Sequence, residues 1–477
     1  MTLRANLAQI ANWIPQAQYF GAGSTEIMGV SHDSRDIKPG SLFIALQGER
    51  FDGHTFLAQA QQQGAVAALV STYHPTINLP QILVKDTRAA LAQLASAWRQ
   101  TCTLPLVLVI GSNGKTTVKE MLAAIFTAAV GEAHCLATRG NYNNEIGLPL
   151  TLLRLEQHHR LAVIELGMNH PGETAQLAQL VQPGVVLINN AQREHQEFMA
   201  NVAAVAQEHG TALKSLSHTG IAVFPADSEY SAVWRHLVKP DQVIDFSLHG
   251  QACVTARSVH VAQNHSALLI HTPQGEITVT LHALGEHNIH NALAACAAAL
   301  AAGVNLEAIR TGLQAFTPVK GRLQIKTVDA LTIIDDTYNA NPDSVRAAID
   351  VLASMTAPRT LILGDMGEVG EQGAFFHREI GAYAKSKGID TLLTVGALSQ
   401  YAGEAFGTRG QHFTDTQVLC DKLQSQRLPR SGTVLVKGSR FMAMERILPL
   451  LQLPVADDAT TAVQTNAYGS RGGLPCC

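Results

Sequence analysis

Between Leu106 and Met121 the chain reads LVLVIGSNGKTTVKEM: an apolar run, a turn bracketed by glycines, and then a helix-forming segment. The apolar run is typical of a strand buried on both faces of a parallel sheet. The turn, Gly111 to Thr116, lies between that strand and a predicted helix that starts near Lys115. This is the layout of a phosphate-binding loop, although the turn lacks two residues of the usual GxxxxGK[ST] pattern.

Each residue type in this turn suits the binding of a triphosphate. Gly111 and Gly114 allow backbone N–H groups to converge on phosphate oxygens, and the positive end of the following helix strengthens that attraction. Lys115 can reach the β- and γ-phosphates, and the hydroxyl of Thr116 can ligate Mg²⁺. GxxGK also occurs by chance in glycine-bearing loops, but the strand before it and the helix after it favour a nucleotide site.

Strands and helices alternate along most of the chain, which predicts α/β architecture with parallel sheets covered on both faces. Predicted strands cover 81–84, 105–110, 161–166, 184–190, 331–336, 360–365, 391–396 and 433–438. Predicted helices cover 55–63, 88–99, 115 onward, 145–154, 172–181, 202 onward, 291–301, 342–354, 373–386, 415–424 and 441–450. Residues 252–282 alternate with period two instead, so we expect an antiparallel patch there.

A chain of 477 residues is long enough for about three domains of ordinary size. We expect a small N-terminal α/β domain (1–86), a central P-loop parallel-sheet ATPase domain (87–318), a C-terminal Rossmann-like domain (319–453) and a disordered tail (454–477). The C-terminal domain lacks a GxGxxG turn, so no dinucleotide cofactor is assigned to it.

Charge and composition exclude several classes of partner. The net charge of −4 and the charged fraction of 15% leave no basic surplus for binding nucleic acid. The N-terminus has no signal-peptide pattern, and no apolar stretch is long enough for a membrane span, so a cytoplasmic protein is expected. The cysteines show no metal-binding spacing and suit a reducing compartment: Cys102, Cys135, Cys253, Cys296, Cys420, Cys476 and Cys477.

Two polar residues follow predicted strands at the edge where ligands of open α/β sheets bind. Glu165 ends the strand LAVIEL, and His195 follows the strand GVVLINN. Either could be a solvated residue after a strand. Together with Thr116 they place a carboxylate, an imidazole and a hydroxyl around a triphosphate, which predicts Mg²⁺ ligands.

A series of strings, in this order and spacing, resembles the Mur ligase family: VIGSNGKTTVKEML, TRGNYNNEIGLPLTLLRL, AVIELGMNHPGE, LGEHNIHNALAA, KGRLQ, IIDDTYNANPDSVRAAID, LILGDMGEVG and LVKGSRFMAMERI. The resemblance runs from DSRDIKPGSLFIALQGERFDGHTF to about Leu451. It is strongest to the member that joins D-alanyl-D-alanine to UDP-N-acetylmuramoyl-tripeptide in peptidoglycan precursor synthesis. The resemblance implies an ATP- and Mg²⁺-dependent ligase that works through an acyl phosphate, a monomer whose domains close over the site.

The resemblance also implies roles for particular residues. Catalytic roles fall on Lys115, Asn144, Glu165 and His195, and metal binding on Thr116, Glu165 and His195. ATP binding falls on Gly111, Ser112, Asn113, Gly114, Lys115, Thr116, Thr117, His287, Asn288, Asn291, Arg322 and Asp336. Substrate binding falls on Ser34, Arg35, Arg50, His54, Asn141, Asn143, Tyr338, Asn339, Asn341, Lys437 and Ser439, the first four at the uridine-diphosphate end in the N-terminal domain. As alternatives, Asn141, Asn143 and Asn144 could be turn residues and Asn291 a helix start.

The sequence departs from the family pattern at His209. The family usually has a lysine there, fourteen residues after the metal-binding histidine, which CO₂ modifies to a carbamate that helps to hold a second Mg²⁺. An imidazole cannot become a carbamate, and Mg²⁺ prefers oxygen. The second metal is then held by other ligands and waters, with Glu208 as a candidate, or is bound more weakly. Ile110 also replaces a common threonine, without loss of a phosphate ligand.

Other functions remain open at this point. A sister ligase that adds one amino acid, or a folylpolyglutamate synthase, would share the loop and the HN motif, but the DDTYNANPDS string argues against both. A nucleotide-binding regulator without ligase activity is the alternative of another class. The sequence leaves open whether the third residue of the acceptor peptide is meso-diaminopimelate or lysine.

Overall fold

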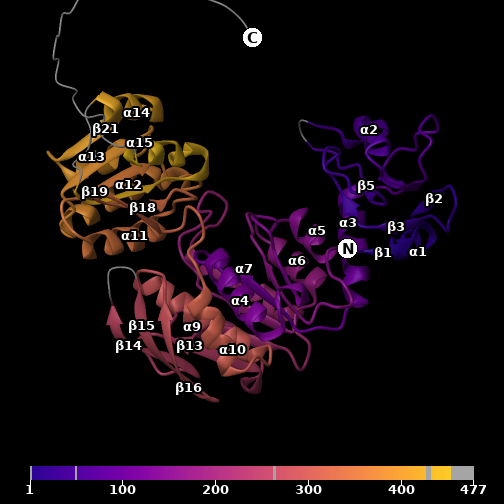
Figure 1. Cartoon of the computed structure of the whole chain (residues 1–477), viewed down its shortest axis with the longest axis horizontal. Coiled ribbons are helices and arrows are strands. Elements are labelled where there is room, and N and C mark those ends of the chain that lie inside the picture. Colours follow the sequence, from indigo (N-terminus) through magenta and orange to yellow (C-terminus); the bar gives the residue numbers. More distant parts are fainter. Residues whose placement is uncertain (1–2, 49–50, 262–264, 426–430, 453–477) are drawn as a thin grey trace, which may run out of the picture.

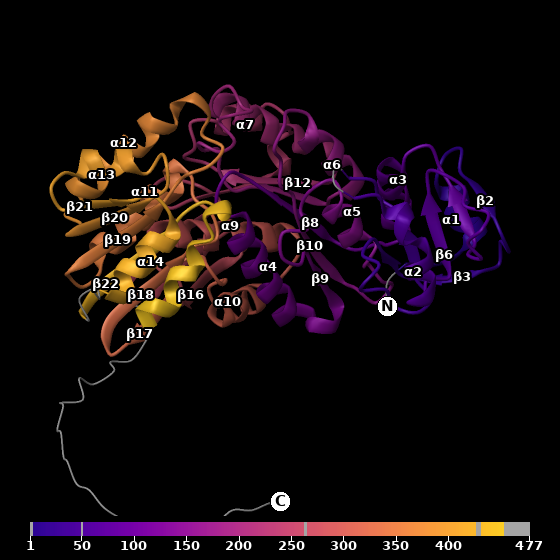
Figure 2. The ribbon, with the colours of Figure 1, turned by 90° about the horizontal axis from the view of Figure 1, so that it is seen from above.

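The computed structural model describes residues 3–48, 51–261, 265–425 and 431–452. The described residues form three lobes in chain order, with the central lobe between the other two (Figures 1 and 2). The expected disordered tail lies outside the described residues. Within the described part of the chain, no helix is both long and apolar enough to cross a membrane.

The N-terminal lobe is a small sheet with helices beside it. Its strands β2, β7, β6, β5 and β4 pair in that order, and β1 pairs with β3 separately. The elements are β1 (Arg4–Asn6), α1 (Leu7–Trp13), β2 (Gln18–Phe20), β3 (Glu26–Met28), β4 (Val30–Ser31), β5 (Leu42–Ile44), the 3₁₀ turn η1 (Gly53–Phe56), α2 (Leu57–Gln62), β6 (Ala67–Val70) and β7 (Gln81–Leu83). Helix α3 (Thr87–Gln100) follows and leads into the central lobe. Helix α3 contacts α1 and also two helices of the central lobe, α5 (Gly147–Leu152) and α6 (Glu173–Val181), so it joins the two lobes.

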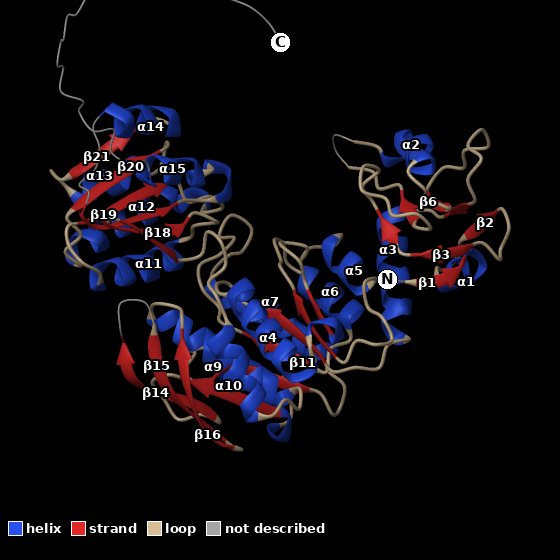
Figure 3. Ribbon diagram, viewed as in Figure 1, coloured by secondary structure: helices blue, strands red, loops and turns tan. Residues whose placement is uncertain are grey.

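The central lobe is built on one long sheet, with helices on both faces (Figure 3). Its strand order is β16-β15-β14-β13-β12-β11-β8-β10-β9. The elements are β8 (Leu106–Ile110), α4 (Lys115–Val130), η2 (Glu132–His134), β9 (Cys135–Ala137), α5 (Gly147–Leu152), β10 (Leu161–Glu165), α6 (Glu173–Val181), β11 (Val185–Ile188), α7 (Val202–Thr211), η3 (Ala212–Ser215), β12 (Ile221–Pro225), α8 (Ser231–Arg235), η4 (Pro240–Gln242), β13 (Val243–Ser247), β14 (Val254–Val261), β15 (Ser266–Thr272), β16 (Gly275–Leu281), α9 (Glu286–Ala301) and α10 (Leu306–Ala315). The strands from β9 to β14 run parallel, and β15 and β16 add the predicted antiparallel patch.

Alternation along β8 explains how this sheet is buried on both sides. Leu106, Leu108 and Ile110 belong to a core with α3, α5 and α6, whereas Val107 and Val109 pack with α4, α9 and α10. Because every residue of β8 is apolar and buried, the strand can lie only in the interior of a two-sided sheet.

The C-terminal lobe is a second α/β sheet, in the strand order β17-β18-β22-β19-β20-β21. Only the pairing of β17 with β18 is antiparallel in the described part of this sheet. The elements are β17 (Gln324–Val328), β18 (Ala330–Asp336), α11 (Pro342–Ser354), β19 (Arg359–Gly364), η5 (Gly370–Gln372), α12 (Gly373–Ser386), β20 (Thr391–Val395), α13 (Gln400–Phe406), β21 (Gly410–Phe413), α14 (Thr416–Ser425), β22 (Ser431–Lys437), η6 (Arg440–Met442), η7 (Met444–Ile447) and α15 (Leu448–Gln452). Helices α11 and α12 have the predicted bounds.

The predicted helix at 441–450 is wrong. The chain there forms η6 and η7, followed by the short α15, because Ala443 takes a left-handed conformation with φ 48° between the two turns. This kink lets Met444 and Ile447, both fully buried, pack into the core of the C-terminal lobe. Packing has overridden a helical pattern here.

Helix α9 begins at Glu286, five residues before the predicted start at Asn291. Asn291 therefore lies inside the helix and is not a helix-start residue. The extra turn carries His287 and Asn288 to the same end of the helix, beside the loop after β8.

Candidate active site

The phosphate-type loop joins β8 to α4 at the carboxyl edge of the central sheet. Strands β10 and β11 flank β8, so the residues after these three strands meet at one edge. Gly114 precedes α4 with φ 80°, a left-handed conformation. A Cβ atom on Gly114 would lie 2.6 Å from Nδ2 of Asn189 and closer still to Oδ1 of Asn291, so the loop requires glycine here.

Buried asparagine side chains stabilise the phosphate-type loop through hydrogen bonds. Asn189, fully buried after β11, donates from Nδ2 to the carbonyl of Asn113 at 2.8 Å and to Oδ1 of Asn291 at 2.9 Å. Asn291 in turn donates to Oδ1 of Asn288 at 3.2 Å. Asn288 and Asn291, predicted for ATP binding, thus brace the loop and also line the cavity above it. The sequence analysis missed Asn189, although a polar residue directly after an apolar strand was a usable signal.

Lys115 lies folded over its own loop. Its Nζ donates to the carbonyl of Gly111 and, at 3.1 Å, to that of Ser112. A third partner comes from the segment after β11: Nζ lies 3.2 Å from Oε2 of Glu194, whose side chain is only 6% exposed. The ammonium group is therefore held at the mouth of the loop, where the end of a triphosphate would lie.

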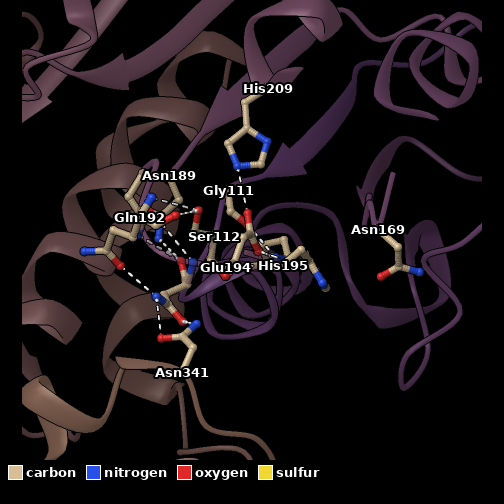
Figure 4. A network of polar contacts seen from close by, with 12 residues as sticks. Gly111, Ser112, Asn169, Asn189, Gln192, Glu194, His195, His209 and Asn341 are labelled. Carbon is tan, nitrogen blue, oxygen red and sulfur yellow. Dashed lines mark hydrogen bonds and ion pairs between the residues drawn. The ribbon is translucent and has the colours of Figure 1, made fainter. Parts of the chain in front are cut away.

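Glu194 is a central residue of this site that the sequence analysis missed. Its Oε1 lies 3.0 Å from Nε2 of His209, which is 2% exposed, and its Oε2 lies 3.8 Å from Nε2 of His195 (Figure 4). Although burial opposes ionisation, Lys115 and His209 lower the pKa of Glu194 to about 2. The carboxylate is therefore charged at neutral pH. Charged neighbours in a loop are typical of a solvent-exposed glutamate, so no local sequence pattern indicates that Glu194 is buried.

The predicted metal ligands lie around the same loop. Glu165 is 2% exposed, and its Oε1 accepts a hydrogen bond from Nδ2 of Asn143 at 2.8 Å. Its other oxygen, Oε2, is buried without a hydrogen-bond partner among the described residues. His195 has its Nδ1 2.7 Å from Oε2 of Glu368 in the C-terminal lobe. An orphaned buried carboxylate oxygen suits Mg²⁺, which prefers such oxygens.

The protein side chains alone do not complete a metal cage. Among the described residues, no three His, Cys, Asp or Glu side chains converge closely enough to hold an ion. Nucleotide-associated Mg²⁺ takes many of its ligands from phosphate oxygens and water, so one or two carboxylates are a sufficient protein contribution. Glu165 therefore fits a magnesium nucleotide, and Thr116 on α4 lines the same cavity.

The C-terminal lobe reaches across to the loop. Arg322 donates from Nη2 to Oγ1 of Thr116 at 3.0 Å, and its guanidinium lies 4.1 Å from the ring centroid of Tyr338. The side-chain amides of Asn341 and Asn113 bond reciprocally, at 2.9 and 3.3 Å. The two lobes thus meet at the predicted phosphate site.

Arg193, another residue that the sequence analysis missed, makes several charged contacts between these lobes. Its guanidinium and backbone N–H bond to Asp343 on α11 at 2.6 to 3.0 Å, and its Nη1 lies 2.7 Å from Oε2 of Glu379 on α12. Planar guanidinium groups bind carboxylates bidentately, which fixes both distance and angle. Arg193 directly precedes Glu194, so the same short segment contacts the C-terminal lobe and the loop lysine.

Three further predicted residues form a buried ion pair or have a shifted pKa. Asp336 pairs with Lys437, whose Nζ lies 2.6 Å from its Oδ2 and also donates to the carbonyl of Asn339 at 2.8 Å. Burial raises the pKa of Asp336, against the effect of Lys437. Burial lowers the pKa of His287 to about 4, so this imidazole is neutral at neutral pH.

A cavity of about 1280 Å³ lies between the central and C-terminal lobes. The predicted site residues that line it are Ser112, Asn113, Gly114, Lys115, Thr116, Thr117, Asn141, Asn143, Asn144, Glu165, His195, His287, Asn288, Asn291, Arg322, Asp336, Tyr338, Asn339, Asn341 and Lys437. Gly111 and Ser439 do not line it. Ser439 instead joins two loops, since its Oγ donates to the carbonyl of Ala340 and accepts from the N–H of Gly367.

Some predicted side chains already have local structural partners. Oδ1 of Asn144 accepts hydrogen bonds from the N–H groups of Ile146 and Gly147 and so caps the start of α5. Glu208, the suggested further cation ligand, does not line the cavity: its Oε1 accepts from the N–H groups at 172 and 174, at the start of α6. That suggestion is not supported by the geometry.

The residues predicted for the uridine-diphosphate end lie in the N-terminal lobe, away from this cavity. Ser34 donates to Oε1 of Gln59 at 3.1 Å, and Arg35 pairs with Asp33 at 2.8 Å. His54 accepts from the N–H of Ser71 through Nε2, which leaves Nδ1 as the donor to Asp52 at 2.6 Å. Arg50 lies outside the described residues.

This fold and site define a class: three-lobed α/β proteins whose central P-loop sheet and C-terminal lobe enclose a nucleotide site. Family models match along the chain as "Mur ligase family, catalytic domain" (26–99), "Mur ligase middle domain" (109–299) and "Mur ligase, glutamate ligase domain" (321–440). The chain belongs to the Mur ligase family.

Two curated relatives are similar over most of their length. A UDP-N-acetylmuramoyl-tripeptide--D-alanyl-D-alanine ligase of Haemophilus influenzae is 41% identical, over 94% of this chain and 98% of the relative. The ligase of the same name from Escherichia coli is 42% identical, over 89% of this chain and 93% of the relative. A crystal structure of MurF from Acinetobacter baumannii superposes with a TM-score of 0.88 at 34% identity, covering 94% of this chain and 99% of that one.

Proposed function

We propose that this chain joins D-alanyl-D-alanine to UDP-N-acetylmuramoyl-tripeptide and consumes ATP in the reaction. Lys115 carries the proposal, because its ammonium group lies over a glycine loop at the carboxyl edge of the central sheet, where a γ-phosphate would be. The names of the relatives, which match along nearly the whole chain, support the same substrates. The product is a precursor for peptidoglycan synthesis.

The reaction needs activation, because a carboxylate is a poor acylating agent. The terminal carboxylate oxygen of the tripeptide attacks the γ-phosphorus of ATP, and ADP leaves. The amine of D-alanyl-D-alanine then attacks the acyl-phosphate carbonyl, loses a proton, and inorganic phosphate leaves with one oxygen of the peptide carboxylate. Catalysis here is mainly positioning and neutralisation of crowded anions.

In this proposal Lys115 and the loop N–H groups hold the phosphates, and Arg322 reaches them from the C-terminal lobe. Glu165 and Thr116 would hold Mg²⁺, with His195 beside them. The ion supplies charge neutralisation at the transferring phosphoryl group. Asn143 orients Glu165 through the bond at 2.8 Å.

We assign the uridine-diphosphate end to the N-terminal lobe and the dipeptide to the C-terminal side of the cavity. The first assignment involves Ser34, Arg35, Arg50 and His54, and the second Tyr338, Asn339, Asn341, Lys437 and Ser439. Asn141 and Asn144 would lie near the reacting carboxylate, and His287, Asn288, Asn291 and Asp336 on the nucleoside side of ATP. The proposed domain bounds are 1–86, 87–318 and 319–453. A cytoplasmic monomer is proposed, since ATP is its substrate and a single chain contains the whole cavity.

The test is phosphate release by purified protein with ATP and Mg²⁺, using UDP-tripeptides that end in meso-diaminopimelate or in lysine. Release should require both a UDP-tripeptide and D-alanyl-D-alanine. Lys115→Ala should lower the rate about a hundred- to a thousandfold, as removal of other transition-state donors does. Hydrolysis that does not depend on the dipeptide would instead support the nucleotide-binding regulator.

A further inference from the structure

Glu194 is a buried carboxylate that has no role in the reaction proposed above. It follows β11, and its two oxygens face different partners: Oε1 faces Nε2 of His209 at 3.0 Å, whereas Oε2 faces Nζ of Lys115 at 3.2 Å. The exposed fractions of these three side chains are 6%, 2% and 17%. In this structure the negative charge of Glu194 is therefore balanced by the lysine of the phosphate loop.

That balance cannot persist when a triphosphate enters. One ammonium group cannot neutralise both Glu194 and the γ-phosphate, and Glu165 adds a second buried carboxylate to the same cavity. Leaving a buried charge without its partner is strongly unfavourable. A further cation at Glu194 would restore the charge balance when Lys115 turns to the phosphates.

The surroundings of Glu194 suit a divalent cation with oxygen ligands. Oε2 of Glu165 is buried and has no hydrogen-bond partner in the described part of the chain, and it lines the same cavity. Nε2 of His195 lies 3.8 Å from Oε2 of Glu194. His209 holds the opposite oxygen, which leaves Oε2 directed at the loop.

We propose that Glu194 is a ligand of the divalent cation that accompanies the nucleotide, and that Lys115 occupies this place only while the nucleotide is absent. The inference rests on the proposed function, because it requires a magnesium nucleotide in the cavity. Lys115 then exchanges one anionic partner for another: Glu194 before binding, phosphate oxygens after it. The net charge around Glu194 stays balanced throughout.

Manganese binding tests the proposal without any turnover. Mn²⁺ titrations monitored by electron paramagnetic resonance, with a non-hydrolysable ATP analogue present, would compare wild type with Glu194→Gln and Glu194→Asp. Glu194→Gln should lose one bound Mn²⁺ or bind it at least about tenfold more weakly. Glu194→Asp, which keeps the charge on a shorter side chain, should fall between the two.

Glu208→Gln is the matched control, because Glu208 is also a buried glutamate close to His209 in sequence but serves only the start of α6 in the described contacts. Its Mn²⁺ binding should equal that of wild type. Equal number and affinity of Mn²⁺ in Glu194→Gln would overturn the inference. Wild-type protein that binds no Mn²⁺ with the nucleotide analogue would overturn the magnesium-dependent function itself.

A second measurement tests the exchange directly. Without nucleotide, Lys115→Met should bind Mn²⁺ more tightly than wild type, since the competing ammonium group is gone. The gain should disappear in Lys115→Met combined with Glu194→Gln. Unchanged Mn²⁺ affinity in Lys115→Met would contradict the placement of Lys115 and the cation at the same carboxylate.

Discussion

At the scale of single residues, Gly114 is a position in the phosphate loop where a side chain cannot be accommodated. Gly114→Ala should weaken binding of an ATP analogue more than about tenfold, because the added Cβ would push against Asn189 and Asn291 and displace the loop that positions the phosphates. Isothermal titration calorimetry measures this directly.

Gly131→Ala separates this clash from backbone strain. Gly131 ends α4 with φ 85° and ψ 149°, a conformation that also favours glycine, but a Cβ there would meet nothing within 4 Å. Its substitution should lower stability by about 1–3 kcal/mol, the cost of backbone strain, and leave nucleotide affinity unchanged. Equal affinities of Gly114→Ala and wild type would show that the loop does not bind phosphate in this conformation.

The histidine at position 209 leads to a prediction about whether turnover depends on CO₂. An imidazole cannot form a carbamate, and Glu194 places a permanent carboxylate 3.0 Å from His209. Turnover should therefore be the same in CO₂-depleted buffer and in buffer with added bicarbonate. Loss of activity on depletion, with recovery in bicarbonate, would show that a modified lysine elsewhere is needed.

At the scale of elements, the segment from Gln192 to Glu197 connects the two halves of the cavity. Arg193 binds α11 and α12, while its neighbours contact the loop: Oε1 of Gln192 accepts from Nδ2 of Asn113 at 2.7 Å. Movement of the C-terminal lobe would therefore displace this segment and, through it, the phosphate loop. The segment is a physical link between lobe closure and the catalytic loop.

Arg193→Met should lower kcat/KM about tenfold to a hundredfold, because the two halves of the site are then misplaced. Small-angle scattering should show a more extended molecule. Arg346→Met is the control: Arg346 shares Glu379, at 3.0 Å, but lies on α11 within the C-terminal lobe. The double variant Arg193→Asp with Asp343→Arg, which exchanges the two charges, should have a higher kcat/KM than Arg193→Asp alone. Equal kcat/KM in both methionine variants would refute the link.

The sequence predicted those elements whose causes are local. Helices α11 and α12 were found to the residue. For α11 the signal is local, because Asn341 and Pro342 mark a helix start and an apolar stripe follows. The loop was found because its glycines, lysine and flanking strand are contiguous. The kink at Ala443 was missed because its cause is the burial of Met444 in a core assembled from distant strands.

The same reasoning explains which site residues were missed. The partners of Arg193 and Asn113 in the C-terminal lobe are 150 and 228 positions away in sequence. No local sequence pattern can therefore indicate these contacts. Glu194 lies in the string QREHQEF, where charged residues are typical of a solvated loop. Only its position between Lys115 and His209 shows that it is buried and charged.

At the scale of the whole molecule, buried histidines make stability depend on acidity. Burial lowers the pKa of His377 from 6.5, and its imidazole bonds to the N–H of Met366 and the carbonyl of Gly373. The unfolded chain then binds more protons than the folded one below about pH 6.5, so stability is lost as the pH falls through that value.

Denaturant unfolding from pH 7 to pH 5 should therefore show a falling free energy of unfolding. His377→Asn should lower stability at pH 7 and flatten its dependence on pH. The exposed His218→Asn should leave that slope unchanged. A slope in His377→Asn equal to that of wild type would mean that other groups control acid sensitivity.

The central claim is that ATP phosphorylates the peptide carboxylate in the cavity between the central and C-terminal lobes. The most direct measurement uses UDP-N-acetylmuramoyl-tripeptide labelled with ¹⁸O in its terminal carboxylate, together with ATP and D-alanyl-D-alanine, and mass spectrometry of the released phosphate. We predict one ¹⁸O atom in each phosphate that is released. Unlabelled phosphate, with turnover intact, would contradict the acyl-phosphate route.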